Sequence, residues 1–361
     1  MARHHTLGRV TWMIYGAYGY TGRLVAELAV DRGHHPVLAG RDEARLAVLA
    51  GELGLAYQAF ALDDGKRLAD AVAGVELIVH CAGPFAATSA SVVDACLRKR
   101  GSYVDITGEI DVLEAVIARD AEARAARVAL LPGSGFDVVP TDCLAAMVVQ
   151  RLPDASELDI AFLAGGGASR GTTRTAIEGL GSGSRARIGG RIATVPAHWR
   201  RRTVPFPSGA RTVASIPWGD VSTAFHSTGV PDTVTFTRVP TGNVAALLQR
   251  IAGPAVRVPG VRRVLTAAVG RRADGPDRDR RSRTRSEIWV EARNADGGAA
   301  SGSLTGPNAY SLTADSVLRV VDRVLSGRVG PGAHTPSRAH GPDFVLELDG
   351  VALHGLSGPA G

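Results

Sequence analysis

Residues 10–133 alternate between short apolar runs and segments with helical spacing. The apolar run 10–16 (VTWMIYG) precedes the helical segment 21–33, and the apolar run 35–41 (HPVLAGR) comes next. The same order repeats as far as the run 128–133 (VALLPG). Short continuous apolar runs are typical of strands buried on both faces, and strands that alternate with helices form parallel sheets. We therefore expect an α/β domain with a doubly wound parallel sheet.

The pattern of residues changes after about residue 140. From 156 to 310, strand-like segments such as 156–165 (SELDIAFLAG) and 285–294 (RSEIWVEARN) alternate with turns rich in glycine and proline. This pattern predicts a second α+β domain with a largely antiparallel sheet. With 361 residues, the chain is long enough for two domains. We place the first domain at 1–140 and the second at 141–361, whose C-terminal segment can pack back on the first.

Three further segments carry structural expectations. The spacing predicts a helix over 313–327 (TADSVLRVVDRVLSG) and a strand within 342–351 (PDFVLELDGV). The segment 181–211 has no strong period and is expected to be a mobile loop or a substrate lid.

A glycine-rich stretch, GAYGYTG at 16–22, lies between the first strand and the first helix. Glycine at 16 permits a tight turn, glycine at 19 lets the backbone approach a pyrophosphate, and glycine at 22 lets helix and strand pack closely. The N–H groups at the helix start, aided by the helix dipole, suit phosphates. The alternative is a purely structural turn. The position of the motif favours a Rossmann-type dinucleotide site formed by Gly16, Tyr18, Gly19, Tyr20, Thr21 and Gly22. We therefore expect 1–140 to be an NAD(P)-binding Rossmann domain and 141–361 to be a substrate-binding and association domain.

Arg41 ends the second strand, in LAGRDEAR. An NAD-binding strand of this type usually ends in an acidic residue that accepts the ribose hydroxyls, whereas arginine suits a 2′-phosphate. Arg41 therefore predicts NADP(H) as the cofactor. The alternative is a surface arginine paired with Asp42 or Glu43. Asp63, after the third strand, is expected to cap the helix that follows.

Acid/base candidates follow the later strands. Ligands bind outside the carboxyl ends of the strands in such sheets, and this rule selects 105–109 (DITGE) and 133–142 (GSGFDVVPTD). Glu109 and Asp137 each follow a strand end beside glycine, where a closed apolar cleft would shift the pKa of either carboxyl. The alternatives are that Glu109 serves the helix starting at 111 and that Asp137 binds amides of its own loop.

Several motifs together resemble the saccharopine dehydrogenase-like oxidoreductases, a family that includes the bacterial trans-acting enoyl reductases. The stretches are GAYGYTGRLVAE, LAGRDEARL, HCAGPFAATSASVVDACL, YVDITGE, GSGFDVVPTD, SIPWGDVSTAFHSTGVP and TPSRAHGPDFVLELDGV, in that order. The resemblance implies the two-domain fold, a nicotinamide cofactor, and a cofactor-facing loop formed by Ala82, Gly83, Pro84 and Phe85. It does not supply a substrate.

Other classes of function are disfavoured. The chain carries a net charge of +6, but its densest basic run, 271–285, holds aspartates and no aromatic residue on which bases could stack, so nucleic-acid binding is not expected. No HExxH or CxxC spacing points to a metal, and neither lysine follows a tyrosine by four positions as in short-chain dehydrogenases. Three cysteines and the absence of a long apolar span suggest a cytoplasmic protein without a transmembrane segment. Peripheral membrane contact and a homodimer stay open.

Three hypotheses remain. The leading hypothesis is NADP(H)-dependent reduction of an activated C=C bond in a small-molecule or carrier-bound acyl substrate of lipid or polyketide type. The others are a saccharopine dehydrogenase-like C–N oxidoreductase and a non-catalytic nucleotide-binding scaffold or sensor. In the second domain, Arg170 and Thr172 within 165–180 could hold an acidic substrate group, or the segment could be only a capped helix.

Overall fold

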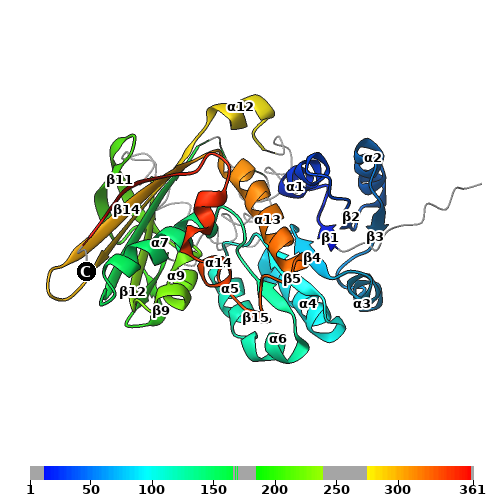
Figure 1. Ribbon diagram of the computed structural model, residues 1–361, viewed down its shortest axis with the longest axis horizontal. Coiled ribbons are helices and arrows are strands. Elements are labelled where there is room, and N and C mark those ends of the chain that lie inside the picture. The colour runs from blue at the N-terminus through cyan, green and yellow to red at the C-terminus, as the bar shows by residue number, and fades with distance from the viewer. Residues whose placement is uncertain (1–11, 166, 168, 170–183, 239–274, 359–361) are drawn as a thin grey trace, which may run out of the picture.

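The computed structural model describes residues 12–165, 167, 169, 184–238 and 275–358. It contains two sheets with helices packed on them, the first formed mainly by the N-terminal part of the chain and the second by the later part (Figure 1). None of the helices in these ranges is both long enough and apolar enough to cross a membrane.

The first sheet has seven strands in the order β15-β6-β5-β4-β1-β2-β3, and every pair is parallel. This confirms the predicted doubly wound α/β fold. Side chains of successive strand residues enter two separate hydrophobic clusters, Ile14 one cluster and Met13 the other. Burial on both faces explains why the strands read as continuous apolar runs. The strands are β1 (Trp12–Tyr15), β2 (Val37–Gly40), β3 (Tyr57–Ala59), β4 (Leu77–His80), β5 (Ser102–Asp105), β6 (Ala129–Leu131) and β15 (Gly332–Ala333).

The helices of this domain follow the predicted order, with two local differences. The segment 111–127 forms two helices, separated at residues 118 and 119. Asp64, not Asp63, caps the third helix, because its side chain accepts a hydrogen bond from the amide of Arg67. The helices are α1 (Tyr20–Asp31), α2 (Glu43–Leu53), α3 (Gly65–Ala73), α4 (Phe85–Lys99), α5 (Ile110–Ile117) and α6 (Asp120–Ala126).

The second sheet has the order β10-β11-β12-β7-β13-β14-β16, with β8 and β9 attached beside β12. Its pairs are antiparallel except for β7 with β12, so the predicted largely antiparallel sheet is confirmed. The strands are β7 (Glu157–Ala164), β8 (Ser184–Ile188), β9 (Arg191–Val195), β10 (Arg201–Phe206), β11 (Gly209–Ile216), β12 (Asp232–Thr237), β13 (Ser286–Arg293), β14 (Ala299–Gly306) and β16 (Ala352–Ser357). The remaining helices are α7 (Val139–Arg151), α9 (Asp220–Thr228), α12 (Arg278–Arg283), α13 (Ala309–Leu325) and α14 (Pro336–His340).

Two expectations for this part of the chain are wrong. From residue 184 on, the segment expected to be a loop or lid forms two hairpins, β8–β9 and β10–β11, and the first turns at Gly189-Gly190, where both residues have positive φ. The strand expected within 342–351 is a 3-10 helix, Pro342–Glu347, and the strand β16 begins only at Ala352. Phe344 and Val345 are both buried, which adjacent residues of a strand with one solvent-exposed face could not be.

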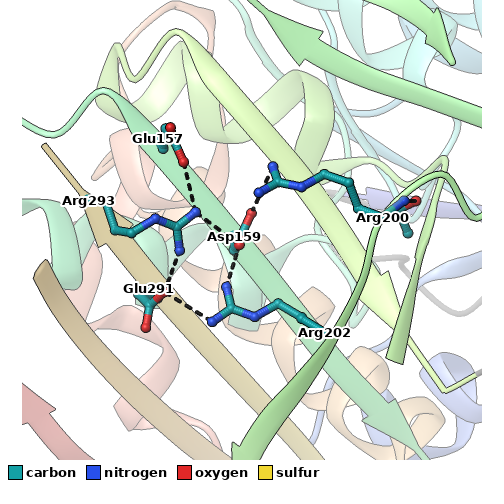
Figure 2. A network of polar contacts seen from close by, with 7 residues as sticks. Glu157, Asp159, Arg200, Arg202, Glu291 and Arg293 are labelled. Carbon is teal, nitrogen blue, oxygen red and sulfur yellow. Dashed lines mark hydrogen bonds and ion pairs between the residues drawn. The ribbon is translucent and has the colours of Figure 1, made fainter. Parts of the chain in front are cut away.

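A charge network folds the β10–β11 hairpin back over the second sheet (Figure 2). The buried carboxylate of Asp159 on β7 pairs with Arg202 of β10 and, at 3.2 Å, with Arg293 of β13. Arg202 also reaches Glu291 at 3.0 Å, and its guanidinium lies 4.5 Å from the ring centroid of Trp289. A buried carboxylate is tolerated here because cations satisfy it. The network therefore defines the position of the hairpin.

The end of the chain returns to the first sheet. Helix α13 packs along α1, where Arg32 donates to Asp315 at 2.6 Å, and β15 pairs with β6 (Figure 1). The chain then crosses again to add β16 beside β14. The first sheet is thus completed by residues far beyond position 140.

Close packing of α1 on the glycine turn predicts a large effect of adding one methyl group. A Cβ atom at Gly22 would lie 2.3 Å from the carbonyl oxygen of Gly16, a backbone atom that cannot move aside. We expect Gly22→Ala to lower the free energy of unfolding by about 1–3 kcal/mol or more, measured by urea denaturation. The matched control is Gly51→Ala in α2, where nothing lies within 4 Å and the change should stabilise by roughly 0.5–1 kcal/mol. Equal effects at the two positions would contradict the packing argument.

Candidate cofactor site and active site

The glycine turn has the geometry of a phosphate cradle. Gly16 has a φ of +83°, and a Cβ there would lie 2.9 Å from Ala82, so both backbone conformation and packing require glycine. At Gly19, the N-cap of α1, a Cβ would meet only the carbonyl oxygen of Gly16, at 3.1 Å. No side chain caps α1 and its first turn holds no acid. The residues present therefore suit a pyrophosphate at this helix start.

The end of β2 carries the predicted 2′-phosphate residue. Arg41 is exposed, and among the described residues it has no ion pair. Asp42, its expected partner, accepts a hydrogen bond from the amide of Arg45 at 3.1 Å and caps α2 instead. This hydrogen bond keeps one carboxylate oxygen of Asp42 at the start of α2. Arg41 thus remains available to an anion.

Tyr20 and Thr21, both predicted to contact the cofactor, differ in their surroundings. The Tyr20 hydroxyl donates to the carbonyl oxygen of Pro276 at 2.5 Å and accepts from Arg281 at 3.0 Å, while its ring stands 4.9 Å from that of Tyr310. The Tyr20 side chain therefore links the glycine turn to the second domain. Its backbone amide is still available to a phosphate. Thr21 is half-buried at the second position of α1.

The loop after β4 is held from two sides. Both oxygens of Glu109 accept hydrogen bonds from the start of α4, from the amide of Phe85 at 2.9 Å and that of Ala86 at 2.7 Å. From inside, the hydroxyl of Thr88 donates to the carbonyl oxygens of Ala82 and Pro84. Glu109 thus serves α4 rather than the helix that follows it in sequence. The loop 82–85 presents a fixed wall beside the glycine turn, with Ala82 against Gly16.

Asp137 lies at the neighbouring strand end. A Cβ at Gly108 would lie 3.0 Å from the Cβ of Asp137 and 3.1 Å from its Oδ2, so the carboxyl occupies the space that a side chain at 108 would fill. Among the described residues, no group hydrogen-bonds to this carboxyl. Burial alone raises its pKa to about 7. The expected alternative, binding of its own loop amides, is not seen in the described part of the chain. Asp137 is thus a carboxyl that exchanges its proton near neutral pH.

A buried acid holds the two loops that carry Glu109 and Asp137. Asp105, at the end of β5, accepts from the amide of Thr107 at 3.0 Å, the amide of Gly133 at 2.8 Å and the hydroxyl of Tyr103 at 2.7 Å. Burial raises its pKa to about 6, against the lowering effect of these hydrogen bonds. Asp105 thereby ties the loop after β5 to the loop after β6.

Trp218 and Phe162 of the second domain form an aromatic cluster with Phe136, a grouping that the sequence did not reveal. Trp218 donates from its indole nitrogen to the carbonyl oxygen of Asp137 at 3.0 Å, and its ring lies 4.9 Å from that of Phe162, which meets Phe136 at 6.0 Å. A Cβ at the next residue, Gly219, would stand 3.3 Å from the carbonyl oxygen of Gly108. The PWGD stretch at 217–220 was visible in the sequence, but nothing local indicated that it meets the first domain.

A further buried carboxyl, Asp220, follows Gly219 in the sequence. Asp220 is fully buried; its Oδ1 accepts from the hydroxyl of Thr141 at 2.5 Å, and its Oδ2 has no hydrogen-bond partner within the described ranges. Burial raises its pKa well above the ordinary range. No group of three His, Cys, Asp or Glu side chains in those ranges is placed to hold a metal ion. The predicted substrate residues Arg170 and Thr172 lie outside the described residues.

Comparison with known proteins identifies the first domain. Residues 12–131 match the family described as saccharopine dehydrogenase NADP binding domain. Over 150 residues the chain is 32% identical to a trans-acting enoyl reductase of Mycobacterium leprae, a match that covers 39% of this chain and 35% of that protein. It is 27% identical over 152 residues to a saccharopine dehydrogenase-like oxidoreductase of Rattus norvegicus, covering 36% and 35%. The chain thus covers about a third of the length of these relatives.

A solved structure shares the whole fold. The apo saccharopine dehydrogenase (L-Glu forming) of Saccharomyces cerevisiae superposes with a TM-score of 0.61, covering 96% of this chain and 100% of that one, at 13% sequence identity. At this identity the likeness concerns the fold alone. Residues 12–131 of this chain thus match the saccharopine dehydrogenase NADP binding domain family, in agreement with the glycine turn and the arginine after β2.

Proposed function

We propose that this protein is an NADP(H)-dependent oxidoreductase that reduces a C=C bond conjugated to a carbonyl in a mostly apolar, acyl-type substrate. The observation that carries the proposal is the half-buried Asp137 carboxyl, with a pKa of about 7, at the strand ends beside the aromatic residues Phe136, Phe162 and Trp218. The names of the enoyl reductase relatives support the same reaction class.

Each group has a role in this proposal. When bound, the cofactor would supply a hydride, which is equivalent to one proton and two electrons, for the β-carbon of the substrate. Asp137 gives its proton to the α-carbon, so that the double bond becomes a single bond and the carboxyl is left as a carboxylate that solvent reprotonates. The turn at Gly16, Gly19 and Gly22 holds the phosphates, and Arg41 holds the 2′-phosphate.

Glu109 is assigned a positioning role. Both of its oxygens are engaged by the first amides of α4, so it keeps the loop 82–85 in place against the cofactor. The same contacts place a carboxylate where helix α4 would otherwise attract an anion. A substrate carboxylate would be repelled there. This favours an acyl substrate over an amino-acid adduct with two carboxylates, the substrate class of the alternative C–N oxidoreductase.

The cofactor assignment predicts an effect of Arg41 on one cofactor only. A charge-assisted arginine–phosphate contact is absent with NADH, so Arg41→Ala should cost on the order of 1–3 kcal/mol of binding free energy for NADPH and little for NADH. Fluorescence titration of the purified protein with each cofactor measures both values. Arg98→Ala, in the last turn of α4, is the control. Equal losses for both cofactors would refute the role of Arg41.

The proton-donor assignment predicts two pH effects of Asp137. Because its pKa in the folded protein is about 7, the carboxyl is protonated below that pH, and the rate of reduction should fall as pH rises through 7. Asp137→Asn should lower kcat by roughly 10²–10⁴-fold and remove this limb of the profile. Asp70→Asn, on the exposed face of α3, is the control.

A stability measurement checks the same pKa without a substrate. The folded pKa lies above the ordinary value of 3.8, so the native state binds the extra proton and the stability falls as pH rises from about 4 to 7. Asp137→Asn should flatten this part of the curve of unfolding free energy against pH. An unchanged slope would mean that Asp137 titrates normally.

A substrate panel decides between the alternatives. Oxidation of NADPH would be followed with enoyl thioesters, both free and carrier-bound, beside saccharopine-type adducts and imines. We expect turnover of enoyl compounds. Turnover of adducts or imines alone would establish C–N chemistry, and NADPH binding without turnover of any compound would favour the scaffold or sensor.

A further inference from the structure

The ring of Tyr18 lies across the end of β2. A Cβ atom at Gly40, the last residue of that strand, would stand 2.6 Å from Cε1 of Tyr18 and 3.3 Å from its Cδ1. Only glycine leaves room for the ring. Tyr18 comes from the glycine turn, so its aromatic face is fixed between the phosphate cradle and the residue that precedes Arg41.

Arg45 is attached to this ring. Its guanidinium carbon lies 4.5 Å from the ring centroid of Tyr18, and Nη2 donates to the Tyr18 carbonyl oxygen at 3.1 Å. A guanidinium stacked on an aromatic face gains a cation–π interaction. The side chain is exposed nevertheless, and within the described ranges Arg45 forms no ion pair.

Arg45 and Arg41 flank one cap residue. Asp42 lies between them in the sequence and accepts the hydrogen bond of the Arg45 amide at 3.1 Å. The end of β2 therefore presents two guanidinium groups and one aromatic ring. One oxygen of the neighbouring acid, Asp42, is engaged at the start of α2. This combination suits a nucleoside that carries a phosphate dianion on its ribose, since guanidinium groups bind phosphate through paired N–H donors.

We infer that Arg45 is a second specificity-determining residue for the 2′-phosphate, and that the stack of Tyr18 and Arg45 forms the adenosine end of the cofactor site. The inference rests on the cofactor position in the proposed function. Arg41 and Arg45 share the phosphate, and the open face of the guanidinium plane supports the adenine. Tyr18 holds Arg45 in that orientation.

The experiment uses two probes that differ only in the phosphate of interest. Adenosine 2′,5′-bisphosphate and adenosine 5′-monophosphate would be titrated into the full chain by isothermal calorimetry. We expect Arg45→Ala to weaken the bisphosphate by about tenfold, the effect of one charged hydrogen-bonding group, and the monophosphate by no more than about threefold. Arg45→Lys should fall between Arg45→Ala and the native protein for the bisphosphate, because it keeps the charge and loses the planar fork.

Arg67 offers a matched control. It is the third residue of α3, and its amide is held by the cap Asp64 at 3.1 Å, just as the Arg45 amide is held by Asp42. Arg67→Ala should leave both probes unchanged. Thermal unfolding would verify that all variants fold, which is expected since both arginines are exposed.

The outcomes separate this inference from the cofactor assignment. A native protein that binds both probes equally would overturn the NADP(H) preference itself, together with the role of Arg45. A native protein that prefers the bisphosphate, with Arg45→Ala unchanged or weakening both probes equally, would overturn the role of Arg45 alone. Selective loss of the bisphosphate supports it.

Discussion

The arrangement of the candidate site depends on one buried carboxyl, Asp105. It accepts hydrogen bonds from two loop amides and one phenol, and thereby fixes the loop after β5 relative to the loop after β6. Such a group is costly to bury unless each contact is made. Once they are made, the loops have one arrangement, in which Glu109 reaches back to α4 and Asp137 fills the space beside Gly108. The positions of both acids thus follow from the hydrogen bonds of this one carboxyl.

The second domain completes this arrangement partly by close backbone contact. Gly219 allows the PWGD stretch to approach Gly108, and Gly135 leaves room for Thr313 of α13, whose hydroxyl accepts from the amide of Phe136. Ser316 of the same helix donates to the carbonyl oxygen of Ser134. The loop that carries Asp137 is therefore clamped between α13 and Trp218. Burial of its carboxyl, not a neighbouring charge, raises its pKa.

Much of the fold was predictable because the information is local. Apolar runs indicated the parallel strands. The glycine positions indicated the conformation of the turn, with positive φ at Gly16 and tight packing at Gly22. The chemistry of the acids was not local. Glu109 finds its partners 23 and 24 positions earlier, and Trp218 reaches a residue 81 positions away, so no spacing rule could separate the roles of Glu109 and Asp137. The hairpin of β10 and β11 escaped notice because its arginine residues interrupt the apolar alternation, and Arg202 is held by the carboxylate of Asp159 on β7.

The pairing of β15 with β6 has a consequence for how the chain is made. A ribosome releases β6 long before β15, so the nascent first sheet keeps an open edge from residue 131 until residue 332 has emerged. The helix α13 that covers α1 arrives equally late. Unpaired edges and uncovered apolar faces favour association with other chains. The chain is therefore most exposed to misassembly while only its N-terminal half has been synthesised. Chaperones that shield this half would act before the second sheet exists.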